Sequence, residues 1–257
     1  MSQIGPKRET VMSRVQAVVP VVTAVALVAS ACGAPESDFL TDLSWEQEFG
    51  ISRCELAPTG RNQYFILEPG FQLVLEGGSE KVAITVLDET KTITGVVDEA
   101  TAPTTVTTRV VEEREWKDDE LIEVSRNFFA ICPTSKDVFY FGEEVDDYQD
   151  GEITSHSGAW LAGENGAKAG LIMSGSPRVG MKYYQEVAPD VALDRAEIVS
   201  LDETLDTPAG AFSNSLKTQE GTALNPNEKE FKTYAPGVGL SQEENLLLTN
   251  YGFIATE

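Results

Sequence analysis

Short segments in which apolar and polar residues alternate follow one another along most of the chain. A period of two places alternate side chains on opposite faces of a strand, so these segments are typical of half-buried β-strands. Pairs of segments separated by four residues predict β-hairpins over 71–76 with 81–88, 104–116 with 121–131, and 137–148 with 153–160. In the third hairpin, Asp150-Gly151 supplies the residues that a type I′ turn requires, because both central positions need positive φ.

The second half of the chain continues in this way after an interruption. Residues 161–180 predict a long loop, because five glycines fall within them. Further strands are expected over 181–187, 195–203, 211–219, 230–235 and 246–252. One short helix is predicted from Phe39 to Phe49, where Ser44 and Gln47 have the spacing of a capping box. The pattern therefore predicts a mainly β protein with little helix.

A faint internal similarity links two parts of this pattern. Leu-Asp-Glu-Thr occurs at 87–90 and again at 201–204, each time at the end of a predicted strand. An aromatic-alanine pair follows each copy, Phe129-Ala130 in the first and Tyr234-Ala235 in the second. A duplicated antiparallel unit would explain the match. Chance is the alternative, because Asp-Glu-Thr after a strand is ordinary turn chemistry.

The N-terminal region has the features of an export signal. Residues 17–29 form an uncharged run of 13 residues, which is shorter than the roughly 20 that a membrane-spanning helix needs. Basic residues precede this run and the small residues 29–31 follow it, as in secretory signal peptides. The basic residues are Lys7, Arg8 and Arg14. Plain secretion and an uncleaved anchor remain alternatives to the more specific interpretation below.

Cys32 and Gly33 come directly after the small residues, and this junction resembles the lipobox of bacterial lipoproteins. One departure is Ala29, which stands where the common motif has leucine. The resemblance implies that residues 1–31 are removed, that Cys32 carries the lipid, and that the protein is anchored at the extracytoplasmic face of a cell membrane. Two or three acyl chains are sufficient for stable anchoring. Residues 32–50 then form a tether with the possible short helix, and residues 51–257 form the β domain.

Cysteine usage agrees with export. Lipidation of Cys32 would leave Cys54 and Cys132 of the three cysteines. Disulfides form and persist outside the cytoplasm, so we expect a bridge between these two residues. Two separate buried thiols are the alternative. A CxxC redox pair is absent from the sequence.

The charge of the chain restricts its partners. Without residues 1–31 the chain holds 41 acidic and 16 basic residues, which gives a net charge of −25. Phosphate backbones would repel such a surface, so we expect no nucleic-acid partner. The acidity indicates either solubility or the binding of cations or basic ligands.

Catalytic and metal-binding motifs are scarce. His156 is the only histidine, which excludes a conventional zinc cluster, and no G-x-S-x-G elbow surrounds a serine. Residues 146–152 resemble a calcium loop, but Ser157 occupies the position where a bidentate glutamate is required. We therefore predict no metal, no cofactor and no catalytic residue, and a looser calcium site built from several loops remains the alternative.

Three turn-rich segments carry a second resemblance. Residues 64–77 ("YFILEPGFQLVLEG"), 207–212 ("TPAGAF") and 234–240 ("YAPGVGL") are similar to motifs of uncharacterised exported β-sheet proteins of bacteria. In these proteins the first segment is a strand pair bent at Pro-Gly. The resemblance implies a strongly curved antiparallel sheet or half-barrel of the kind used by carriers and sensors. It implies no activity.

Aromatic and charged residues suggest where a ligand would bind. Arg195 and Glu197 would share one strand face near the predicted strand that holds two tyrosines, and a tryptophan could line the same site. The candidate pocket residues are Tyr183, Tyr184, Arg195 and Trp160. We expect a β domain that binds a small molecule or lipid, or acts as a scaffold, without catalysis. A carboxylate-dependent hydrolase of the cell envelope and a purely structural envelope protein are the alternatives.

Overall fold

The computed structural model describes residues 44–96 and 104–254. The chain divides into two units, Met1–Asp38 and Phe39–Glu257, and every described residue belongs to the second. The predicted signal peptide, the lipidation site Cys32 and residues 39–43 of the predicted helix lie outside the described residues.

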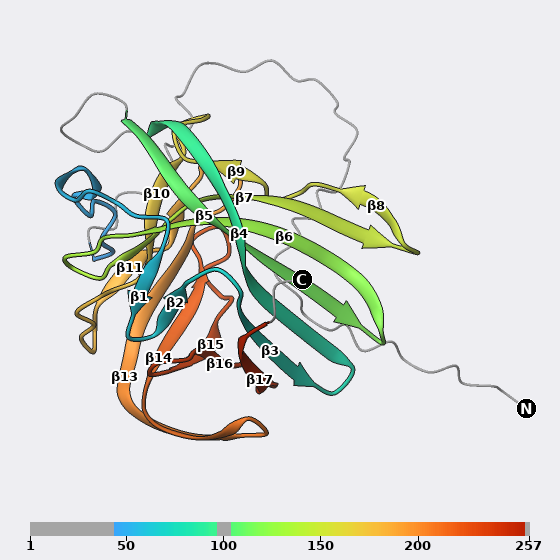
Figure 1. The fold of residues 1–257 in the computed structure, drawn as a ribbon. Helices are drawn as coiled ribbons and strands as arrows, with labels where there is room; N and C mark the ends of the chain where they lie inside the picture. Colours follow the sequence, from blue (N-terminus) through green and yellow to red (C-terminus); the bar gives the residue numbers. More distant parts are fainter. Residues whose placement is uncertain (1–43, 97–103, 255–257) are drawn as a thin grey trace, which may run out of the picture. The chain divides into compact units, whose positions relative to one another are not determined.

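The described unit is built almost entirely from β-strands (Figure 1). In chain order its elements are the 3₁₀ turn η2 (Ile51–Arg53) and strands β1 (Gly60–Asn62), β2 (Phe65–Leu67), β3 (Phe71–Gly77), β4 (Glu80–Val96), β5 (Thr104–Lys117), β6 (Glu120–Ile131), β7 (Val138–Gln149), β8 (Glu152–Ser155), β9 (Trp160–Leu161), β10 (Lys168–Met173), β11 (Lys182–Tyr184), β12 (Glu186–Val187), β13 (Asp194–Thr207), β14 (Gly210–Thr222), β15 (Glu230–Ala235), β16 (Gly239–Glu243) and β17 (Leu246–Phe253). The expectation of a mainly β protein is confirmed.

Fifteen of these strands form one antiparallel sheet. Its order is β11-β13-β14-β15-β16-β17-β3-β4-β5-β6-β7-β10-β12, and β8 and β9 both pair with β7. Strands β1 and β2 pair with each other in a separate two-stranded sheet. Neighbours in the order are mostly neighbours in sequence, so hairpins build most of the sheet.

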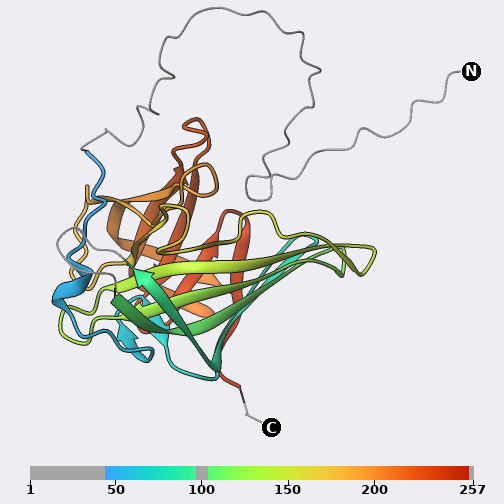
Figure 2. The ribbon, with the colours of Figure 1, turned by 90° about the horizontal axis from the view of Figure 1, so that it is seen from above.

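The two ends of the sheet order meet in one short segment. Lys182–Tyr184 pairs with β13, and Glu186–Val187 pairs with β10. Gln185 lies between them and donates its backbone N–H to the Asp194 carbonyl at 2.8 Å. The sheet therefore curls until it is nearly closed, as the curved half-barrel of the resemblance implies. Viewed from above, the green strands and the orange and red strands lie on opposite sides of this curve (Figure 2).

All three predicted hairpins form. They are β3–β4, β5–β6 and β7–β8, and their strands begin and end within a few residues of the expected positions, except that β4 runs on to Val96 and β8 ends at Ser155. At the last turn Asp150 has φ 53° and Gly151 has φ 80°, which is the positive-φ pair that a type I′ turn requires.

The predicted helix is wrong over its described part, residues 44–49. Glu46 instead forms a parallel bridge with Tyr183: its N–H donates to the Lys182 carbonyl at 3.0 Å, and its carbonyl accepts from the Tyr184 N–H at 2.9 Å. Pairing with the edge strand satisfies backbone groups that a helix would satisfy locally, and tertiary pairing of this kind outweighs a local cap.

Three other predictions need correction. Residues 161–180 are not one long loop, because they contain β10, which pairs with β7 and β12. The segment 64–77 is not a strand pair, because β2 pairs with β1 while β3 pairs with β4 and β17. Strand β16 was not among the predicted strands, although it links β15 to β17.

The repeated Leu-Asp-Glu-Thr segments occupy equivalent places in two long strands. The first lies in β4, where the pairing register with β5 shifts between Val86 and Thr90. The second lies in β13, where the register with β14 shifts between Ser200 and Leu205. Neither copy forms the turn that its composition suggests. Both are irregular positions within a strand, and such bulges increase the local bend and twist of a sheet.

Candidate functional site: a pocket beside the disulfide

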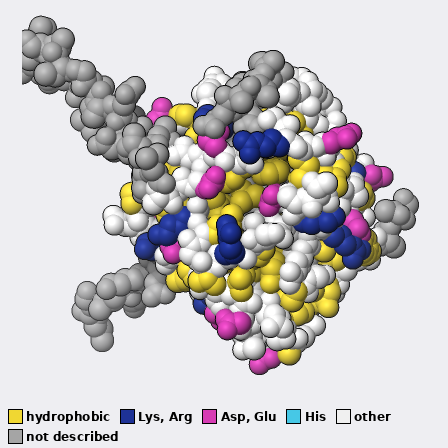
Figure 3. Space-filling model, turned by 90° about the vertical axis from the view of Figure 1, so that its left-hand side faces the viewer, with side chains coloured by type: hydrophobic (Ala, Val, Ile, Leu, Met, Phe, Trp, Pro, Cys, Tyr) yellow, Lys and Arg dark blue, Asp and Glu magenta, His cyan; other side chains and the backbone are white. Residues whose placement is uncertain are grey.

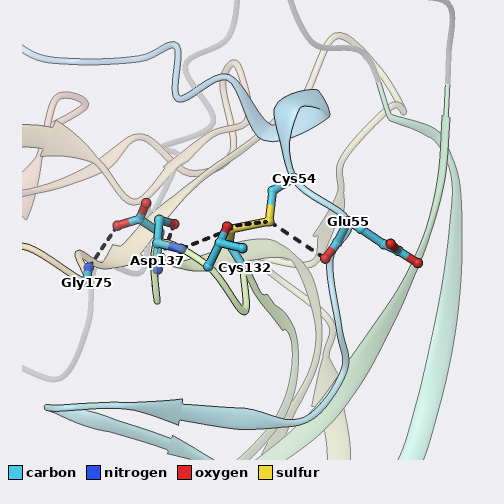
Figure 4. Close-up of a disulfide and its surroundings, with 7 residues drawn as sticks. Cys54, Glu55, Cys132, Asp137 and Gly175 are labelled. Carbon is cyan, nitrogen blue, oxygen red and sulfur yellow. Dashed lines mark hydrogen bonds between the residues drawn. A yellow bond between two sulfur atoms is a disulfide. The ribbon is translucent and has the colours of Figure 1, made fainter.

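A disulfide joins the segment before β1 to the end of β6 (Figure 4). Cys54 and Cys132 form this bond across a sequence separation of 78 residues, which confirms the predicted pairing. The backbone around Cys132 is tightly turned, since its N–H donates to the Asp137 carbonyl at 2.9 Å and its carbonyl accepts from the Lys136 N–H at 2.8 Å. The disulfide therefore fixes residues 44–53 against the loop between β6 and β7.

A second loop packs against this one. Asp137 Oδ1 accepts the Gly175 N–H at 2.8 Å and the Ser174 hydroxyl at 3.4 Å (Figure 4). A Cβ on Gly175 would lie 1.9 Å from the Ser135 carbonyl oxygen, so only glycine allows the two loops to approach this closely. The Asp137 carboxylate thus has a structural role in joining the loop before β7 to the loop after β10.

The segment 44–53 closes the third side. The Phe49 ring lies 6.4 Å from the Phe139 ring, centroid to centroid. Gly50 has φ 62° immediately before η2, and a Cβ there would lie 3.1 Å from Cδ and Nε of Arg53. The chain therefore turns at Gly50 and places the stem of Arg53 over the turn.

These three segments enclose a pocket of about 460 Å³. We call it the N-terminal pocket. Volumes of about 300–1,000 Å³ are usual for small-molecule sites. Its apolar lining comes from Phe49, Phe139, Leu171 and Met181. Phe139 and Leu171 are buried, so they form the floor. Serine hydroxyls add polarity to the walls, from Ser52, Ser135, Ser174 and Ser176.

The charged groups of the N-terminal pocket differ in whether they are paired. Glu48 accepts Lys168 Nζ at 2.7 Å, and Asp137 is engaged by the loop after β10. Among the described residues, neither Arg53 nor Arg178 has a carboxylate within ion-pair distance, and both side chains are exposed at the mouth. Glu46 is also exposed there.

Figure 3 shows the side of the described unit on which residues 44–56 and β11 lie in Figure 1. Hydrophobic side chains gather near the centre of this face, and both basic and acidic side chains lie around them (Figure 3).

The sequence-predicted pocket residues are placed differently. Tyr183 and Tyr184 are fully buried on β11. Arg195 pairs with Tyr184 in the sheet, and its guanidinium carbon lies 4.5 Å from the Trp45 ring centroid. On the same face Lys182 Nζ and Glu197 form an ion pair at 3.2 Å. The expected strand face of Arg195 and Glu197 exists, but these residues stack and pair and do not line the N-terminal pocket.

Trp160 lies apart from those three residues, on β9, where it pairs with Glu143 of β7. It lines a smaller pocket of about 220 Å³ together with Leu161, Ala188 and Val191. Its ring is buried and lies edge-on to Tyr140, with centroids 5.2 Å apart. The structure therefore does not bring the four predicted residues into one site.

A buried polar cluster inside the sheet was missed from the sequence. Lys232 on β15 is only 8% exposed, and its Nζ lies 2.9 Å from Glu243, 3.2 Å from Glu230 and 3.5 Å from Glu220. Glu220 Oε1 also accepts the Tyr234 hydroxyl at 3.1 Å. Burial first, and then the Glu220 charge, raises the pKa of Tyr234 well above its ordinary value, so this phenol stays neutral.

One buried carboxyl has a strongly shifted acidity. Burial, followed by repulsion from Asp194 and Glu143, raises the pKa of Glu186 well above its usual range. Its Oε1 accepts the Asp194 N–H at 3.2 Å. Glu186 does not line either pocket described above. The hydrolase alternative requires a carboxyl with a raised pKa opposite a second acid in a cleft, and Glu186 does not occupy such a position.

Two features are absent from residues 44–96 and 104–254, a cluster of metal ligands and a membrane-spanning helix. That part of the chain contains no group of three or more His, Cys, Asp or Glu side chains that could hold a metal ion. It also contains no helix with the length and apolar character needed to cross a bilayer. No family model matches the chain, and neither the curated proteins nor the solved structures include one that is detectably similar.

Proposed function

We propose that the chain is an exported lipoprotein, anchored through Cys32 at the extracytoplasmic face of a cell membrane, whose β domain binds a ligand without catalysis. The observation that carries the binding role is the N-terminal pocket. It is preformed, because the Cys54–Cys132 disulfide and the contact between Asp137 and Gly175 hold its walls together. A preformed pocket with an apolar floor and few polar groups is typical of small-molecule sites.

The chemistry of the pocket favours binding over hydrolysis. Carboxylate-dependent hydrolysis needs two acids free to act on one bond. Of the three acids that line the pocket, Asp137 holds the neighbouring loop and Glu48 is paired with Lys168. Glu46 is the acid that remains, and it is exposed at the mouth.

The export part of the proposal is tested by Cys32→Ser. In the native host, the unaltered protein should carry acyl chains detectable by mass spectrometry and should partition with membranes. The variant should lose the acyl mass and leave the membrane fraction. Partitioning of the variant with membranes at its usual mass would contradict lipid anchoring at this residue.

The binding part is tested with an uncharged fluorescent probe, N-phenyl-1-naphthylamine. We expect the oxidised full chain carrying Cys32→Ser to increase the emission of the probe, because the pocket floor is apolar. A further change, Ser176→Trp, fills the pocket from its wall and should abolish this increase. Ser213→Trp, at an exposed position of β14, is the matched control. Equal emission from both tryptophan variants would place binding elsewhere and contradict the proposal.

A further inference from the structure

We infer that the ligand of the N-terminal pocket is an amphiphile with a single anionic head group, bound with its head at Arg53 and Arg178 and its apolar tail on Phe139 and Leu171. This inference rests on the proposed function, because it names the class of ligand for the same pocket. Three features of the pocket carry it: the unpaired charges, the position of those charges relative to the floor, and the contrast with the rest of the chain.

The first feature is the balance of unpaired charge. Glu48 and Asp137 already have partners in Lys168 and the Ser174–Gly175 backbone and hydroxyl. The remaining charged groups that line the pocket are two guanidiniums, on Arg53 and Arg178, and one carboxylate, on Glu46. Asp137 keeps its negative charge, because its partners are neutral, so Asp137 and Glu46 together offset the two guanidiniums. Neither guanidinium, however, has a carboxylate within ion-pair distance among the described residues. A guanidinium offers several donors in a planar fork that matches carboxylate and phosphate oxygens.

The second feature is the separation of charge from apolar surface. Phe139 and Leu171 are each 3% exposed and lie at the floor, while Arg53 and Arg178 are exposed at the mouth. Phe49 and Met181 also line the pocket, and both are partly buried and pack against the core. A ligand that satisfies both ends has an apolar tail and an anionic head. A small anion would not contact the apolar floor, and an uncharged apolar ligand would not pair with the guanidiniums.

The third feature is the contrast with the chain as a whole. A protein with net charge −23 repels anions from most of its surface. Elsewhere in the described residues, arginines are commonly paired: Arg61 with Glu68 at 2.6 Å, and Arg114 with Glu112 at 2.7 Å. Two arginines without carboxylate partners at the mouth of one pocket therefore provide a local exception that an anionic head group would match.

The stem of Arg53 has a defined place in this arrangement. It lies over Gly50, where a Cβ would approach its Cδ and Nε to 3.1 Å, so the glycine leaves room for the stem to follow the turn. The adjacent Cys54 is fixed by the disulfide to Cys132. The turn that carries Arg53 is therefore held in place by the disulfide. Less conformational entropy is lost when a ligand binds, because this part of the pocket is already ordered.

The test compares four probes on the oxidised full chain carrying Cys32→Ser: octanoate, octan-1-ol, octylamine and acetate. The first three share a tail length and differ in head charge, and acetate has the head without the tail. Isothermal titration should show octanoate binding at least about tenfold more tightly than octan-1-ol or acetate, with octylamine weakest. The double change Arg53→Gln and Arg178→Gln should remove the advantage of octanoate over octan-1-ol. Arg114→Gln, outside the pocket, is the matched control and should keep it.

The possible outcomes separate the inference from the proposed function. Equal binding of octanoate and octan-1-ol would keep the pocket as a binding site and overturn the anionic head group. Preferred binding of octylamine would assign recognition to Glu46 and also overturn it. Binding of acetate as tight as that of octanoate would overturn the role of the apolar floor. Equal emission of N-phenyl-1-naphthylamine with Ser176→Trp and with Ser213→Trp would instead contradict the proposed function itself.

Discussion

Gly170 on β10 approaches the backbone of Gln185 so closely that a Cβ at position 170 would lie 2.3 Å from the Gln185 carbonyl oxygen. Gln185 is the residue at which the sheet passes from its β13 side to its β10 side. The near closure of the sheet therefore depends on the absence of a side chain at one position.

The first prediction concerns this closure. Gly170→Ala should lower the free energy of unfolding by about 3 kcal/mol, because the added methyl meets backbone atoms and not the end of a flexible side chain. Gly151→Ala is the control: it introduces positive-φ strain in the open β7–β8 turn and should cost about 1 kcal/mol. Urea unfolding measures both. Equal losses would show that the backbone around Gln185 accommodates the methyl group at little cost, and would contradict the role assigned to Gly170.

The second prediction concerns the disulfide. Reducing the Cys54–Cys132 bond, or replacing both residues by serine, should lower the free energy of unfolding by about 4 kcal/mol, the value expected for a loop of about 80 residues. The change should also weaken probe binding in the N-terminal pocket, because residues 44–53 lose their covalent link to the opposite wall. Unfolding curves and probe titrations with and without reductant check this. Unchanged binding after reduction would show that contacts such as Phe49 with Phe139 hold the wall unaided.

The third prediction concerns Lys232. Replacing it by methionine leaves three glutamates near a buried apolar side chain, so the free energy of unfolding should fall by about 3–5 kcal/mol. Lys229→Met, at an exposed position before the same strand, should change it by less than about 0.5 kcal/mol. Denaturant midpoints of both variants give the comparison. A loss for Lys232→Met no larger than that of the control would mean that water enters the cluster and solvates its carboxylates.

The fourth prediction concerns pH. The pKa of Glu186 is raised in the folded protein, so the folded state keeps a proton that the unfolded state releases. Stability from this group is therefore present below the usual carboxyl pKa and is lost as the pH rises towards the raised value. Glu186→Gln removes this titration, so unfolding free energy measured from about pH 5 to about pH 8 should fall less steeply than in the unaltered protein. Glu120→Gln, at an exposed position, is the matched control, and an equal change of slope in both variants would contradict the assignment to Glu186.

The hairpins could be predicted because their information is local. In β3 the burial alternates along Phe71–Gly77 as the apolar and polar residues do, and Asp150-Gly151 specifies its own turn. The errors arose where distant contacts decide. Gly170 belongs to a glycine-rich stretch that predicts a loop, yet it is needed for close packing of β10 against Gln185. The Ser44–Gln47 pattern reads as a helix start, yet Glu46 pairs with the edge strand.

The candidate site could not be predicted for the same reason. Arg53 and Arg178 lie far apart in the chain and belong to no motif, and only the folded sheet and the disulfide bring them to one pocket. The Lys232 cluster gave a misleading local signal. Alternation in Glu230–Ala235 would bury Phe231, but Phe231 is 42% exposed and Lys232 is buried, because the three glutamates on β14, β15 and β16 surround the lysine.

The two Leu-Asp-Glu-Thr copies also differ in what surrounds them. The copy in β4 is contacted by Arg109 of β5, whose guanidinium donates to the Leu87 carbonyl. The same guanidinium lies 3.3 Å from Oδ1 of Asp88. In β13, the residues after Ile198 pair only with β14 among the described strands, so the second copy lies along an open edge. An open edge is where another chain can add a strand and start aggregation, and charged side chains discourage this. The acidic residues of the second copy, together with Asp206, thus oppose edge-to-edge pairing between neighbouring molecules. This repulsion matters most where many copies lie close together.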